Sequence, residues 1–116
     1  MRIIEGTQSA AGFKFAVVVS KYNDFVTDRL QQGALAALEA AGVRSEDITV
    51  VRVPGAFEIP LAARQVADTS QFDGIICLGC LIRGATPHFE YISSAVAHGL
   101  TAASGETGIP MAFGVL

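Results

Sequence analysis

The sequence lacks several features that would place it in other classes of protein. It contains no tryptophan, only 16% of its residues are charged, and its net charge is −3. It has no run of lysine and arginine, the residues whose neutralisation of phosphates drives most nucleic-acid binding. No apolar stretch approaches the roughly 20 residues needed to cross a bilayer, and the N-terminus lacks the charged-then-apolar order of a signal peptide. We therefore expect a cytoplasmic protein that binds neither nucleic acid nor membrane.

Cysteine is also scarce, although its two copies, Cys77 and Cys80, have the C-x-x-C spacing of redox and zinc sites. Residues three apart on a strand point to opposite faces of a sheet, which separates the two thiols. A structural zinc site needs four ligands, and the chain adds only two distant histidines. We expect both cysteines to be small buried hydrophobic residues in a reducing compartment, with no metal bound.

What the sequence has in abundance is apolar residues, which make up 51% of its 116 positions. That is enough to bury the core of one domain, residues 1–116, and too little chain for two. Short, nearly unbroken apolar runs of the kind buried in parallel sheets predict four strands, at 15–19, 48–53, 75–78 and 111–115.

Helical periodicity between these runs predicts three helices. The first is capped by Asn23 or Asp24 and stopped by Gly42, and the second runs from Pro60 to about Ala67. The third has Thr86 as its N-cap and Pro87 at its first helical position, and glycines 105 and 108 end it. Strand and helix alternate three times before a final strand, which predicts a three-layer α/β fold with a parallel sheet. In such folds the ligand crevice lies beyond the carboxyl ends of the strands.

The stretch GCLIRGATPHFEY, residues 79–91, carries most of the polar chemistry at that edge of the sheet. Its turn leads into a helix whose first N–H groups offer an anion site, with His88 in the first helical turn as a proton-transfer group. A histidine here also fits a plain capping or solvated role. Glu58, near the start of the second helix, could likewise only stabilise the helix dipole, and Tyr22 could be an ordinary loop aromatic.

Together with SKYNDF (20–25) and VPGAFEIP (53–60), this stretch resembles the lumazine synthase family, in the family's order and spacing from about Phe13 to the last residue. The resemblance implies a flavodoxin-like, doubly wound sheet of four strands. A neighbouring subunit's N-terminal arm, residues 1–12, would add a fifth strand through its β-prone piece 2–4, although this arm also fits a frayed terminus. It further implies pentamers, or larger assemblies of pentamers.

The family's reaction condenses 5-amino-6-(D-ribitylamino)uracil with 3,4-dihydroxy-2-butanone 4-phosphate. It yields 6,7-dimethyl-8-ribityllumazine, phosphate and water, in the penultimate step of riboflavin biosynthesis. The resemblance implies a transferase with small-molecule substrates, no cofactor, and riboflavin synthase as a further partner. Two alternatives stay open: a homologous riboflavin synthase of the same fold, which would handle no phosphate, and a non-catalytic lumazine- or flavin-binding shell protein.

By resemblance, His88 is the catalytic proton-transfer residue and Tyr22 stacks on the pyrimidine. Arg83 is structural rather than ligating. The other implied substrate-binding residues are Asn23, Ala56, Phe57, Glu58, Cys80, Leu81, Ile82 and, from an adjacent subunit, Phe113, and the implied phosphate-binding residues are Gly84, Ala85 and Thr86. Family members continue for a few dozen more residues, so we expect a C-terminal helical part to be absent from this chain and its activity alone to suffer.

Overall fold

The computed structural model describes residues 1–85 and 87–116, and within them strands and helices alternate as expected. Their order is β1 (Phe15–Ser20), α1 (Asp24–Ala40), η1 (Ser45–Asp47), β2 (Ile48–Val53), η2 (Ala56–Glu58), α2 (Ile59–Asp68), β3 (Gly74–Gly79), α3 (His88–Thr107) and β4 (Met111–Val115). Strands β2 and β4 have the predicted bounds. Strand β1 extends one residue further than predicted, and β3 gains a glycine at each end.

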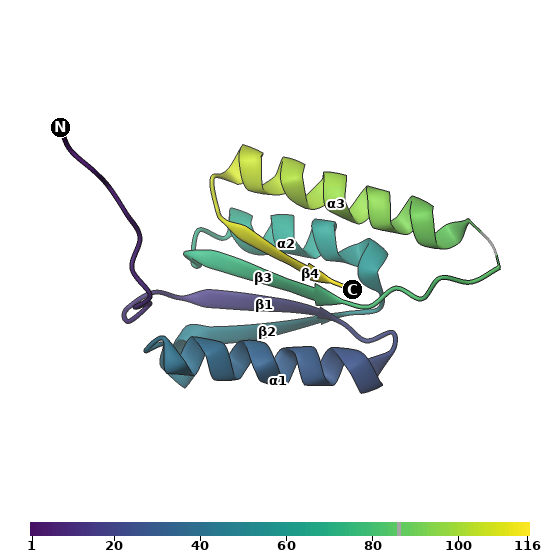
Figure 1. The fold of residues 1–116 in the computed structure, drawn as a ribbon, viewed down its shortest axis with the longest axis horizontal. Helices are drawn as coiled ribbons and strands as arrows, with labels where there is room; N and C mark the ends of the chain where they lie inside the picture. Colours follow the sequence, from purple (N-terminus) through teal and green to yellow (C-terminus); the bar gives the residue numbers. More distant parts are fainter. Residues whose placement is uncertain (86) are drawn as a thin grey trace.

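The four strands form one parallel sheet in the order β2-β1-β3-β4. Helix α1 covers one face of the sheet, and α2 and α3 lie side by side on the other (Figure 1). The chain therefore winds outward from β1 in both directions, and the predicted three-layer, flavodoxin-like α/β fold is confirmed. The carboxyl ends of all four strands meet at one edge of the sheet, where the crevice was expected.

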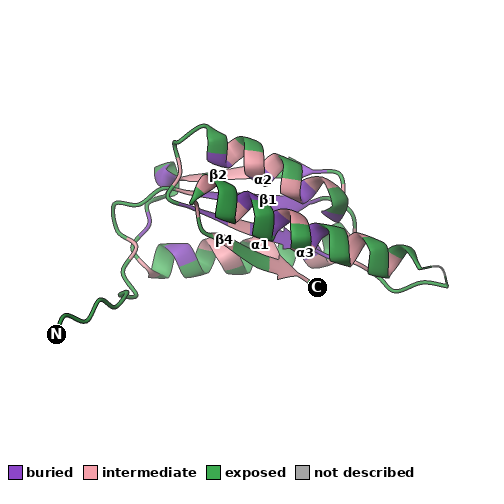
Figure 2. Cartoon of the chain, turned by 90° about the horizontal axis from the view of Figure 1, so that it is seen from above, coloured by how far each residue is buried: buried purple, intermediate pink, exposed green. Residues whose placement is uncertain are grey.

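The alternation of side chains along β1 and β3 divides the core into two halves. Val17, Val19 and Leu78 face α1, where they pack with Leu38. On the other face, a larger cluster lies beneath α2 and α3 and includes Ala16, Val18, Ile59, Ile75, Cys77, Val96 and Leu100. Buried residues concentrate on the two central strands and on the inner faces of the helices, as Figure 2 shows. The central strands therefore fix where each flanking loop begins.

Both cysteines are buried free thiols, as predicted, with Cys77 fully enclosed and Cys80 at the end of β3. Burial raises the pKa of the Cys77 thiol to about 12. The side chain therefore stays protonated near neutral pH, and it supplies no thiolate for redox chemistry or metal binding.

The start of α3 differs from the prediction. Pro87 is the N-cap residue, and its carbonyl oxygen accepts hydrogen bonds from the N–H groups of Glu90 and Tyr91, both at 3.2 Å. Proline loses nothing at a cap, where its missing N–H would have no helical partner. His88 is consequently the first helical residue, and Thr86, the predicted cap, lies outside the described residues.

The end of α3 is set by Gly108, which adopts a left-handed φ of 74°. Gly105 lies inside the helix and does not end it, contrary to the prediction, because the left-handed turn comes three residues later, where the Gly108 N–H donates to the Ser104 carbonyl at 2.9 Å. Gly42 follows α1 with a φ of 97°, as predicted.

Residues 1–12 form an arm that leaves the body of the molecule (Figure 1). No strand forms in this arm, and Ile3 and Ile4 are 73% and 84% exposed. The arm is tied to the domain near its end, where the Ala10 N–H bonds to the Ala41 carbonyl at 2.8 Å. Its pairing with a neighbouring subunit stays a prediction. Among the helices of the described residues, none has the length and apolar character that crossing a membrane would require.

Candidate active site

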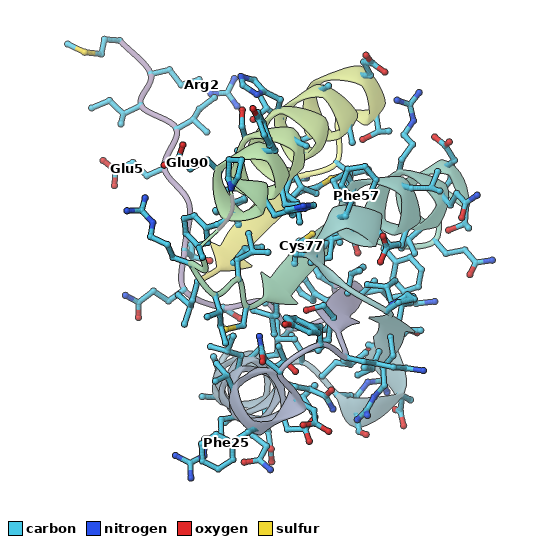
Figure 3. All side chains as sticks on the ribbon, turned by 90° about the vertical axis from the view of Figure 1, so that its right-hand side faces the viewer. Arg2, Glu5, Phe25, Phe57, Cys77 and Glu90 are labelled. Carbon is cyan, nitrogen blue, oxygen red and sulfur yellow. The ribbon has the colours of Figure 1, made fainter. Side chains whose placement is uncertain are left out.

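A cavity of about 400 Å³ lies at the carboxyl edge of the sheet and draws on all three predicted loops. Figure 3 looks onto this edge and shows Phe57 beside α2, whereas Phe25 points away from the far side of α1. The lining residues are Tyr22, Pro54, Gly55, Ala56, Phe57, Glu58, Leu81, Ile82, His88, Phe89 and Ile92.

One wall of the cavity, here called the β2 wall, consists of Tyr22 and residues 54–58. Backbone hydrogen bonds continue the pairing of β1 and β2 past the strand ends, from Lys21 N–H to Val53 O at 2.7 Å and from Tyr22 N–H to Pro54 O at 3.0 Å. Ala56 is buried, whereas Tyr22 and Phe57 are 61% and 63% exposed. Two aromatic faces thus stand on firmly held backbone, a geometry that suits a flat heterocycle.

Glu58 closes this wall as the N-cap residue of α2, which places it near the helix N-terminus as predicted. Its side chain makes no capping hydrogen bond with any described residue, so the carboxylate keeps its acceptor capacity for a ligand. A side chain on Gly55 would begin 3.3 Å from Glu58 Oε1. The absence of that side chain leaves room for the carboxylate, which can accept hydrogen bonds from several hydroxyl groups.

The opposite wall, here called the α3 wall, consists of Leu81, Ile82, His88, Phe89 and Ile92. Its backbone is tied to the sheet at its start, where the Leu81 N–H donates to Leu116 O at 2.7 Å. No backbone hydrogen bond joins residues 82–85 to any other described residue. The first turn of α3 then carries His88 to the cavity, where its ring is exposed and bonds to no described side chain. The ring is therefore available to a bound substrate as a proton donor or acceptor.

Seven of the residues named from the sequence line the cavity, namely Tyr22, Ala56, Phe57, Glu58, Leu81, Ile82 and His88. Cys80 is buried at the end of β3 and does not line it. Gly84 and Ala85 are exposed on the turn between Ile82 and α3, outside the lining, and Thr86 is not among the described residues.

Asn23 and Phe113 also lie outside this cavity. Asn23 caps α1 in a left-handed conformation, with a φ of 60° and no side-chain capping bond to the described residues. Its Nδ2 is buried without a described partner. Phe113 lies on β4, 52% exposed, and lines a separate cavity of about 360 Å³ between α3 and β4. Phe113 therefore does not reach the cavity of its own chain. A residue that contributes to the site of an adjacent subunit would have to lie outside its own in this way.

Four lining residues were not named from the sequence: Pro54, Gly55, Phe89 and Ile92. Ile92 lies four residues after His88 and three after Phe89, the spacings that bring helix side chains together, whereas Phe89 directly follows His88. Helical periodicity counted from His88 would therefore have found Ile92. In the described residues, no group of three or more histidine, cysteine and acidic side chains is arranged to hold a metal ion.

Comparison with known proteins agrees with this arrangement. The family model for 6,7-dimethyl-8-ribityllumazine synthase matches residues 12–116. A 6,7-dimethyl-8-ribityllumazine synthase of Syntrophus aciditrophicus (strain SB) is 54% identical over 114 residues, which cover 98% of this chain and 74% of that protein. One of Nitratidesulfovibrio vulgaris (strain DP4) is 48% identical over 116 residues, covering 100% of this chain and 74% of that protein. The chain therefore belongs to the 6,7-dimethyl-8-ribityllumazine synthase family.

Proposed function

We propose that this protein acts as a transferase of riboflavin biosynthesis. It condenses 5-amino-6-(D-ribitylamino)uracil with 3,4-dihydroxy-2-butanone 4-phosphate to 6,7-dimethyl-8-ribityllumazine, releasing phosphate and water. The observation that carries the proposal is the convergence of three separate family motifs on one cavity, with aromatic rings on one wall and a histidine on the other. Family membership supports the same conclusion.

The β2 wall is proposed to hold the ribitylaminouracil. Its pyrimidine ring stacks against Tyr22 and contacts Ala56 and Phe57, and Glu58 accepts hydrogen bonds from the ribityl hydroxyls. Asn23 is proposed to add its buried, unpartnered amide to this subsite. Backbone groups of residues 80–82, at the end of β3, read the edge of the uracil.

The α3 wall is proposed to hold the phosphate-bearing substrate, with residues 84–86 before the helix N-terminus as the anion site. The 5-amino group of the uracil attacks the ketone carbon, and loss of water leaves an imine. Elimination of phosphate then leaves an enol, whose tautomerisation turns the carbon that bore the 3-hydroxyl into a carbonyl and the phosphate-bearing carbon into a methyl group. The ribitylamino nitrogen attacks this new carbonyl, and loss of a second water closes the ring. His88 transfers protons to and from the oxygens that leave. Because the substrate's own amine is the nucleophile, the protein's main tasks are orientation and proton transfer, and no cofactor is required.

The assembly is proposed to be a pentamer or a larger assembly of pentamers. Support comes from Phe113, which is exposed and lies outside the cavity of its own chain. It also comes from the apolar arm residues Ile3 and Ile4, which are largely exposed. Riboflavin synthase, which would consume the lumazine, is a proposed partner. We place the protein in the cytoplasm, a location that suits its two free thiols.

The test is to mix the purified protein with both substrates and to measure lumazine fluorescence and phosphate release together. Equal appearance of the two products is expected. A protein that binds lumazine but forms neither product would be a carrier or shell protein. In a second assay that supplies the lumazine itself, a protein that consumes it without any release of phosphate would be a riboflavin synthase. Either result would overturn the proposal.

A further inference from the structure

The turn between β3 and α3 is held mainly by side chains. Residues 82–85 make no backbone hydrogen bond with the rest of the described chain. A link nevertheless runs from this turn to the helix, because Arg83 Nη2 lies 3.3 Å from Glu90 Oε1. The Arg83 guanidinium carbon also lies 5.3 Å from the centroid of the Phe89 ring, close enough for a cation–π contact.

Arg83 makes both contacts at once because a guanidinium group can stack through its flat face and donate hydrogen bonds through its edge. The two contacts join the turn to adjacent positions on the first turns of α3. Phe89 lines the cavity, so the guanidinium lies on the outer side of a cavity wall. The ion pair spans seven positions in the sequence, and the segment that it closes contains Gly84, Ala85 and His88.

We propose that Arg83 and Glu90 are positioning residues for the condensation, an inference that rests on the proposed function. Their ion pair and the Phe89 contact hold the phosphate turn against α3 and so fix the distance between the bound phosphate and His88. Arg83 itself does not bind the substrate. In the described structure its charge is paired with Glu90, and neither residue lines the cavity.

The opposite assignment makes a different prediction. If Arg83 bound the phosphate directly, Glu90 would compete with the substrate for the guanidinium, and Glu90→Gln would tighten phosphate binding. If the pair positions the turn, loss of either partner weakens binding. The energy involved is modest because both side chains are 71% exposed.

The experiment uses the full chain with Arg83→Gln, Glu90→Gln and the charge-exchanged double variant Arg83→Glu with Glu90→Arg. Each single variant should lower kcat/KM by about 3- to 30-fold, the range expected from an exposed ion pair plus a cation–π contact. The loss should come mostly from a higher KM for the butanone phosphate, with the KM for the ribitylaminouracil within about twofold of wild type, because the β2 wall is untouched. The exchanged variant should recover part of the loss.

A matched control is available on the same helix. Arg64 of α2 and Glu106 of α3 form an exposed ion pair at the far end of α3, outside the cavity lining. Arg64→Gln and Glu106→Gln should leave both KM values unchanged. Melting temperatures of all variants separate a local effect on the turn from a general loss of stability.

Calorimetry with inorganic phosphate provides a readout that does not depend on activity. If the wild-type protein formed no product, the proposed function would be refuted. The phosphate affinities of the variants would still test the ion pair between Arg83 and Glu90. The inference is overturned if Glu90→Gln binds phosphate more tightly than wild type. It is also overturned if the single variants match wild type, if both KM values rise equally, or if the exchanged variant recovers nothing.

Discussion

The two walls of the cavity are built in different ways. The β2 wall extends the sheet, since its backbone hydrogen bonds prolong the pairing of β1 and β2 and lead directly into α2. The α3 wall begins on the sheet but crosses an exposed turn before it reaches the helix, and side chains of Arg83, Glu90 and Phe89 make the described link. The β2 wall is therefore ready to receive a rigid ring, whereas the α3 wall depends on weaker contacts.

This difference matches the proposed division of labour. The ribitylaminouracil presents a flat heterocycle and a polyol, which a rigid aromatic and carboxylate surface can bind with little rearrangement. The butanone phosphate is small and loses its phosphate during the reaction, so its subsite has to hold an anion and later release it. A loosely anchored turn at a helix N-terminus serves both steps.

The largest expected effect comes from removing the chemistry of the α3 wall. His88→Ala should lower kcat by roughly 10- to 10⁴-fold, the lower limit reflecting the intrinsic reactivity of the substrates. Substrate binding should change far less, because the β2 wall remains. Steady-state kinetics with both substrates measures the two effects separately.

His98→Ala is the matched control on the same helix. The His98 ring lies on the outer side of α3, where Nδ1 is 2.9 Å from Ser94 O, and it does not line the cavity. Its replacement should leave kcat unchanged. Equal turnover of His88→Ala and wild type would remove the proton-transfer role and leave His88 with positioning alone.

A second prediction compares the packing beneath the two walls through the same substitution. A side chain on Gly79 would begin 3.0 Å from Ile59 Cδ1 and 3.2 Å from Ser20 Oγ, beneath the buried Ala56. Gly79→Ala should therefore destabilise the fold by about 1–3 kcal/mol through overpacking. Gly84 has open space around it, so Gly84→Ala should change the free energy of unfolding by no more than about 1 kcal/mol, and in the stabilising direction.

Urea denaturation of both variants measures the contrast. Phosphate affinity should show the opposite contrast. Gly84→Ala should lower it more than Gly79→Ala does, because Gly84 lies on the proposed phosphate turn whereas Gly79 does not. Equal destabilisation by the two substitutions would mean that the α3 wall is packed as tightly as the β2 wall.

The sequence predicted the β2 wall well for physical reasons. Apolar runs determined the bounds of β2, and Pro54, Gly55 and Pro60 marked the break and the next helix, so Glu58 could be placed at a helix start. Local signals of this kind depend on neighbouring residues only. The parallel sheet then brings loop ends together whatever lies between them.

The α3 wall was predicted less well because its geometry depends on contacts across a turn. A threonine followed by proline favours a cap at Thr86, but the helix begins one residue later with Pro87 as its cap. The ion pair joins Arg83, which lies on the turn outside α3, to Glu90 inside the helix, so helical periodicity does not indicate it. The proposed role of Phe113 concerns a proposed subunit interface, and neither the periodicity nor the spacing of this one sequence indicates such an interface.

The smallest expected effect concerns a single ring on the β2 wall. Tyr22 should cover one face of the pyrimidine and contribute about 1 kcal/mol of stacking, so Tyr22→Ala should weaken binding of the ribitylaminouracil by about fivefold. Tyr22→Phe should bind it almost as well as wild type, because the stacking face is kept and the residue is already 61% exposed. The main-chain bond from residue 22 to Pro54 O survives both changes, so the wall itself should hold.

Calorimetry with two ligands shows whether the effect stays on one wall. Inorganic phosphate occupies the α3 wall in our assignment, so its affinity should be the same in Tyr22→Ala, Tyr22→Phe and wild type. A matched substitution on the other wall, Ile82→Ala, removes an apolar side chain that is 63% exposed and likewise lines the cavity. If Tyr22→Ala weakened both ligands equally, the loss would come from collapse of the loop and not from stacking. The two walls would then form one mechanical unit, and the contrast between a rigid and a tethered wall would fail.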